Sequence, residues 1–88
     1  MGGIAKRTGE FVETTIDDEV VAMELAKGEF FSITGTGLAI WKLIDGTRGR
    51  DALVEELAKE FDAPKIEIAS DVDAFLASLR NAGLIDWG

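Results

Sequence analysis

The apolar residues of this chain change their spacing once, near residue 34. Before that point they alternate with polar residues over short segments, which is typical of β-strands. After it they recur every third or fourth residue, which is typical of amphipathic helices. An order with all strands first and all helices afterward is typical of the α+β class. We therefore predict a βββααα domain in which a three-stranded antiparallel sheet packs on three helices.

Three strands are predicted before residue 34, over residues 10–16, 19–25 and 29–33. Turn residues separate them at hairpin spacing, "DD" at 17–18 and "KG" at 27–28, and Gly28 can adopt the positive φ that such turns need. Short connections of this kind join neighbouring antiparallel strands. The strand at 29–33 is therefore expected at one edge of a sequential meander.

Three helices are predicted after residue 34, over residues 37–44, 50–61 and 65–82. Thr34 or Thr36 can cap the first helix, and Gly49 can cap the second. Gly46 and Gly83 are predicted to end the first and third helices, because glycine adopts the left-handed C′ conformation at little steric cost. After Gly83, Leu84 is placed to contact Leu79 as in a Schellman motif.

The length of 88 residues fits one domain, predicted over residues 10–88, after a flexible arm over residues 1–9. No apolar run approaches the roughly 20 residues that span a membrane. The first ten residues, "MGGIAKRTGE", also lack the apolar stretch of a secretory signal. We expect a cytoplasmic protein with no membrane partner.

The chain contains neither cysteine nor histidine, so thiolate and imidazole chemistry are both excluded. No glycine-rich phosphate loop is present, and we expect no enzyme activity, no metal and no cofactor. The net charge of −8 opposes nucleic-acid binding, because that depends on Lys and Arg neutralising phosphates. A binding module is therefore the favoured class of function.

The predicted edge strand, "EFFSI" at residues 29–33, has little of the protection that edge strands usually carry. Only Glu29 is charged, and alternation sends Phe31 and Ile33 toward the helices while Phe30 and Ser32 point away. In one interpretation another segment covers this edge and both phenylalanines belong to the core. In the other, an extended peptide adds itself as a further strand.

The run "GEFFSITGTGLAIWKLIDG", with "LVEELAKEFDAP" and "DVDAFLASLRNAGLI" further on, resembles the PqqD-like peptide chaperones, also called RiPP recognition elements. The resemblance covers about residues 11–85. It implies a winged-helix-like βββααα domain that binds the leader segment of a ribosomally made precursor peptide. The leader would lie along the third strand, in the crevice between that strand and the third helix, and modifying enzymes would then act on the core peptide.

The resemblance implies that this crevice is lined from two sides. The strand would contribute Glu29, Phe30, Phe31, Ser32 and Ile33, and the third helix would contribute Ile68, Asp71, Val72, Phe75 and Leu76, with Leu79 as the floor. Ordinary core packing is an equally good interpretation of Val72, Phe75, Leu76 and Leu79. Asp71 could meet a Lys or Arg of the leader.

Within this family the segment "VVAMELAKGEFFSITGTG" is most similar to the stand-alone leader-binding proteins of lasso-peptide biosynthesis. Their partners are a leader peptidase and a cyclase. PqqD proper, which serves a radical enzyme in pyrroloquinoline quinone biosynthesis, is the alternative. A winged-helix DNA-binding regulator is an alternative of another class, which Asp71 and Asp73 on the third helix oppose. An acidic carrier protein is also disfavoured, because Ser70 lacks an Asp-Ser-Leu setting.

Overall fold

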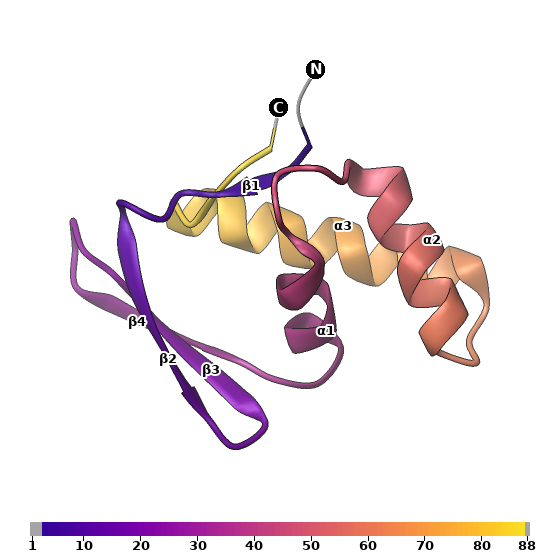
Figure 1. Cartoon of the computed structure of the whole chain (residues 1–88), viewed down its shortest axis with the longest axis horizontal. Helices are drawn as coiled ribbons and strands as arrows, with labels where there is room; N and C mark the ends of the chain where they lie inside the picture. The colour runs from indigo at the N-terminus through magenta and orange to yellow at the C-terminus, as the bar shows by residue number, and fades with distance from the viewer. Residues whose placement is uncertain (1–2, 88) are drawn as a thin grey trace.

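The computed structural model of the chain describes residues 3–87 (Figure 1). Three strands are followed by three helices, so the predicted α+β class and the βββααα order are both confirmed. Two strands of two residues each stand at the ends of the chain in addition. The elements are β1 (Ala5–Lys6), β2 (Phe11–Ile16), β3 (Glu19–Glu24), β4 (Glu29–Ile33), α1 (Gly35–Leu43), α2 (Arg50–Glu60), α3 (Lys65–Ala82) and β5 (Ile85–Asp86).

The main sheet is an antiparallel meander of order β2-β3-β4. Its inner face is buried against the helices, where Val20 lies opposite Ile33 and Ala22 lies opposite Phe31. Its turns have left-handed residues, as hairpins require, because Gly28 has a φ of 71° and Asp17 a φ of 53°. The predicted meander is therefore confirmed, with β4 at one edge.

The helices pack around one core with the inner face of the sheet. Trp41 of α1 is almost fully buried and makes an edge-to-face contact with Phe11, with the ring centroids 5.5 Å apart. The predicted Schellman motif ends α3, since Gly83 N–H donates to the Arg80 carbonyl and Leu84 N–H donates to the Leu79 carbonyl. Leu84 is completely buried, which fixes the direction of the chain after α3.

The prediction that Gly46 ends the first helix is wrong. That helix already ends at Leu43, with Ile44 as its C-cap, and Gly46 lies two residues further on with a φ of 88°. The reason is tertiary, because Gly46 N–H donates to the Ile4 carbonyl at 3.0 Å and its own carbonyl accepts a hydrogen bond from Gly3. The left-handed glycine shapes the loop between α1 and α2 to receive the N-terminal segment.

The expectation of a loose arm over residues 1–9 does not hold for residues 3–7. Ile4 is only 3% exposed and belongs to the core, and its N–H donates to the Arg48 carbonyl at 2.8 Å. After it, β1 pairs antiparallel with β5, so the two ends of the chain lie side by side (Figure 1). The part of the expectation that concerns residues 1 and 2 lies outside the described residues.

Candidate functional site

The outer edge of β4 has no strand beside it within residues 3–87. The hydrogen-bond pattern between β2, β3 and β4 determines which backbone groups of β4 face this outer edge. Leu25 N–H donates to the Glu10 carbonyl at 2.9 Å, so the odd-numbered residues of β3 bond toward β2 and the even-numbered ones toward β4. In β4 the partners of those even-numbered residues are Glu29, Phe31 and Ile33. Phe30 and Ser32 consequently direct their N–H and C=O groups at the open edge.

The side chains of β4 alternate as the sequence predicts. Ile33 is buried and Phe31 half-buried on the inner face, whereas Phe30 is 70% exposed on the outer face. Ser32 is exposed, and its hydroxyl donates to the Glu19 carboxylate on β3. Glu29 is also exposed and begins the strand. The open edge is thus flanked by one large aromatic side chain on each face of the sheet.

The predicted residues of α3 divide into a buried set and an accessible set. Asp71 is exposed and Phe75 is half-buried, one helical turn apart. The buried set, none of which is more than 4% exposed, comprises Ile68, Val72, Leu76 and Leu79. Ile33 of β4 is buried to the same degree. Of the predicted residues on α3, only Phe75 and Asp71 therefore have accessible surface, and the others belong to the core.

The first turn of α1 links the two sides of the site, since α1 packs against β4 and against α3. Gly37 lies under the Phe75 ring, and a Cβ atom at this position would come within 3.0 Å of Phe75 Cε1. Only a residue without a side chain lets the ring lie this close to α1. The sequence predicts Gly37 as part of the first helix but gives no sign of this contact.

We expect the Gly37→Ala substitution to displace the Phe75 ring without unfolding the domain. Alanine favours the helix by up to about 1 kcal/mol over glycine, which offsets the cost of moving a half-buried ring. Nuclear Overhauser effects between the Phe75 ring and α1 should change, while the melting temperature stays nearly constant. Gly49→Ala is a suitable control, because nothing lies within 4 Å of a Cβ atom there. Unchanged contacts of Phe75 in the Gly37 variant would contradict this packing.

The outer face of the sheet carries an apolar row that the sequence analysis did not single out. Val12, Met23 and Phe30 lie opposite one another on β2, β3 and β4, and Val12 and Phe30 are exposed. Ile16, also exposed, lies on the same face. The period-two pattern of β2 could have indicated this face. The row is continuous with the open edge, because Phe30 belongs to both.

Two expected absences can be compared with the described part of the chain. No helix between residues 3 and 87 is long and apolar enough to cross a bilayer. Over the same range, no three His, Cys, Asp or Glu residues lie close enough together to hold a metal ion. The open edge of β4 presents backbone groups and aromatic side chains, a surface that suits binding of a polypeptide in an extended conformation.

A three-stranded antiparallel sheet packed on three helices, with one edge strand that no strand of residues 3–87 covers, is the winged-helix-like α+β architecture that the resemblance implies. The family model described as "Coenzyme PQQ synthesis protein D (PqqD)" matches residues 19–85, and the chain belongs to this family. The predicted resemblance to PqqD-like RiPP recognition elements is thereby confirmed.

Two curated relatives, each named "PqqA binding protein", come from Gluconobacter oxydans (strain 621H) and Rhizobium meliloti (strain 1021). Each is 36% identical over 55 residues, which is 62% of this chain. The matched region spans 57% and 56% of these relatives, respectively, so a large part of each lies outside it.

The fold is also similar to that of a solved complex described as "TbiB1 in Complex with the TbiA(beta) Leader Peptide". The TM-score is 0.79 at 28% sequence identity, and the match covers 88% of this chain and 90% of the other. The family match begins at residue 19 and so does not include β1 and β2, which the present structure describes.

Proposed function

We propose that the chain binds, without catalysis, the leader segment of a ribosomally synthesised precursor peptide. The leader would add as a fourth strand to β4, in the crevice between β4 and α3. The observation that carries this proposal is the open edge, at which Phe30 and Ser32 present backbone groups that pair with no strand of residues 3–87. The names of the relatives support the ligand class, since they describe binding of PqqA and a complex with a leader peptide.

Six of the predicted site residues have surface to offer in this proposal. Glu29, Phe30, Phe31, Ser32, Asp71 and Phe75 would contact the leader, and the buried Ile33, Ile68, Val72, Leu76 and Leu79 would hold them in place. Two residues with one N–H and one C=O each provide about four main-chain hydrogen bonds, at roughly 0.5–1.5 kcal/mol net apiece. Ordering a flexible leader costs about 2–5 kcal/mol. Apolar side chains of the leader, packed against Phe31 and Phe75, must therefore dominate the affinity.

The bound peptide would be delivered to modifying enzymes, for which a leader peptidase and a cyclase of lasso-peptide biosynthesis are the preferred candidates. The alternative is presentation of the precursor to a radical enzyme in pyrroloquinoline quinone biosynthesis. The apolar row of Val12, Met23 and Phe30 supports delivery, because an enzyme that covers it would also touch a peptide lying beside β4.

A titration of the isotope-labelled chain with the leader of a short precursor encoded beside its gene tests this proposal. Amide shifts should concentrate at residues 29–33 and 71–75, because these segments line the crevice. A leader with its apolar residues changed to serine serves as the control and should leave both segments unchanged. A saturating leader that perturbs neither segment would show that the site is wrong. Titrating lasso-peptide and PqqA leaders in parallel distinguishes the two enzyme systems.

A further inference from the structure

The end of the molecule formed by α2 and α3 carries a surface depression that the proposed peptide site does not use. Its volume is about 500 Å³, and it lies between α2 and the first turns of α3. Figure 1 shows α2 at the opposite side of the molecule from the sheet. A ligand in this depression and a peptide on β4 would therefore not compete for space.

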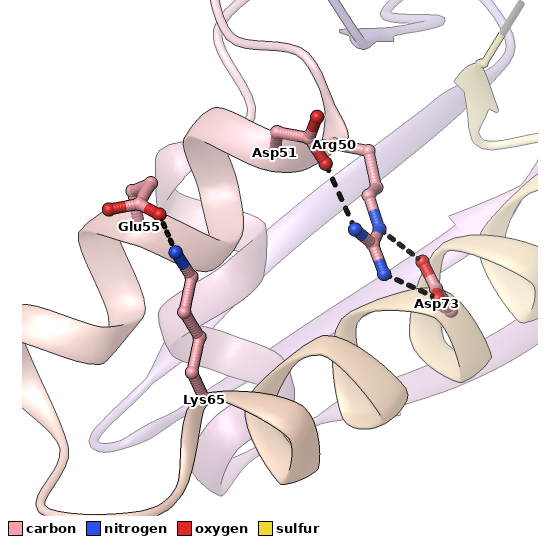
Figure 2. A network of polar contacts seen from close by, with 5 residues as sticks. All are labelled: Arg50, Asp51, Glu55, Lys65 and Asp73. Carbon is pink, nitrogen blue, oxygen red and sulfur yellow. Dashed lines mark hydrogen bonds and ion pairs between the residues drawn. The ribbon is translucent and has the colours of Figure 1, made fainter.

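The four charged residues that line the depression take part in ion pairs, which Figure 2 shows. Arg50 donates from Nε and Nη2 to both carboxylate oxygens of Asp73, at 2.7 and 2.8 Å, and from Nη1 to Asp51 at 2.9 Å. The hydrogen bonds from Arg50 lower the pKa of Asp73 below its usual value. Lys65 forms a second ion pair with Glu55. Both cations at the depression are thus already engaged by carboxylates of the chain itself.

The surrounding surface retains an excess of negative charge. Two carboxylates, Asp51 and Glu55, and two cations, Arg50 and Lys65, line the depression, and Asp73 beside Arg50 adds a third carboxylate, which leaves one negative charge in excess. The Asp51 side chain is almost fully exposed, and more than half of the Glu55 side chain is exposed as well. These carboxylates can accept further hydrogen bonds from a cationic group. An anionic occupant such as a phosphate or a nucleic acid is disfavoured for the same reason.

Apolar side chains form the floor and one rim of the depression. Val54 of α2 is buried beneath it, and Ala69 of α3 is half-buried. Ile66 lies at the rim with 80% of its surface exposed, more than any other large apolar residue in the described part of the chain. An aliphatic side chain laid across Ile66 and Ala69 would remove this surface from water.

We propose that this depression is a docking site for a basic segment of a partner protein. A Lys or Arg side chain of the partner would lay its aliphatic stem on Ile66 and Ala69 and place its charged head between Asp51 and Glu55. The inference rests on the proposed function to the extent that the partner is a modifying enzyme. The chain would then hold a peptide at β4 and an enzyme at α2 and α3 together.

A short amidated peptide that alternates Lys and Leu serves as the probe for this site. Titrated into the isotope-labelled chain, it should shift the amides of residues 50–55 and 65–69. The Ile66→Ser substitution should weaken binding about tenfold, since it removes most of an exposed aliphatic side chain. The double variant Asp51→Asn with Glu55→Gln should also weaken binding and reduce its dependence on salt. Ala52→Ser, an exposed position of α2 outside the depression, should leave binding unchanged.

The same measurements contain the results that would overturn the inference. These are shifts confined to the sheet, equal binding of a peptide with Glu in place of Lys, or wild-type affinity in the Ile66→Ser variant. A leader titration of that variant separates this inference from the proposed function, because leader binding should be unchanged in it. If the leader fails to bind the wild-type chain while the basic peptide still binds at residues 50–69, only the proposed function fails.

Discussion

Replacing Ile4 by Asp should lower the free energy of unfolding by about 3–5 kcal/mol. Ile4 is 3% exposed and lies in the core, and its backbone is bonded to Gly46 and Arg48 in the loop between α1 and α2. An unpaired carboxylate at such a site, together with the lost apolar burial, costs about 3–5 kcal/mol. A domain of 88 residues has a stability of about 4–13 kcal/mol. The loss is therefore a large share of the stability of the domain. Denaturant unfolding, followed by tryptophan fluorescence, would measure the change in the free energy of unfolding.

Ile66→Asp is the matched control for this experiment, because it makes the same chemical change at a position that is 80% exposed. It lies in the first turn of α3, where a negative charge interacts favourably with the helix dipole. The denaturant concentration at its unfolding midpoint should stay close to that of the wild type. If Ile4→Asp unfolded at the same denaturant concentration as this control, residues 3–7 would not be part of the folded domain in solution.

The sequence predicts the strands and helices of the domain well because each has a clear period and a clear end. The alternation in "EFFSI" and the apolar stripe of α3 are long enough to be recognised without tertiary information. The β1–β5 ribbon could not be predicted in the same way, because two residues contain no period. Ile4 is the only large apolar residue between Met1 and Phe11, and backbone hydrogen bonds to the α1–α2 loop hold it where its side chain joins the core. The hydrogen bonds of Gly46 with Gly3 and Ile4 also explain why this glycine lies in the loop and does not end α1.

The candidate site was predictable on the strand side and less so on the helix side. Edge position and alternation follow from the order of the strands, so the exposure of Phe30 and the inward direction of Phe31 were both expected. On α3 the same apolar spacing describes the floor of a groove and the centre of a core. The fully buried Val72 and Leu76 therefore could not be told apart in advance from the half-buried Phe75. The contact of Phe75 with Gly37 depends on how α1 and α3 cross, which no local pattern encodes.

The substitution Ser32→Pro should abolish or greatly weaken leader binding while leaving the domain folded. The Ser32 N–H points to the open edge, so proline there removes no bond between β3 and β4. It does remove a donor that the added strand needs, worth about 0.5–1.5 kcal/mol, and its ring obstructs the approach of the peptide backbone. We expect affinity to fall at least about tenfold. Isothermal titration calorimetry with the leader peptide would measure the change.

Ser32→Val separates the backbone effect from the side-chain effect, because it also deletes the hydroxyl that bonds to Glu19 but keeps the N–H. Valine suits a strand, so this variant should bind the leader with nearly wild-type affinity. Phe31→Pro should behave differently from both, since the Phe31 N–H faces Ala22 on β3 and its loss would disrupt the sheet itself. Near-equal affinities of the Ser32→Pro and Ser32→Val variants would mean that the leader does not pair with β4 at this residue. The affinity would then depend on side-chain contacts with Phe31 and Phe75 alone, and the strand-addition mechanism would have to be abandoned.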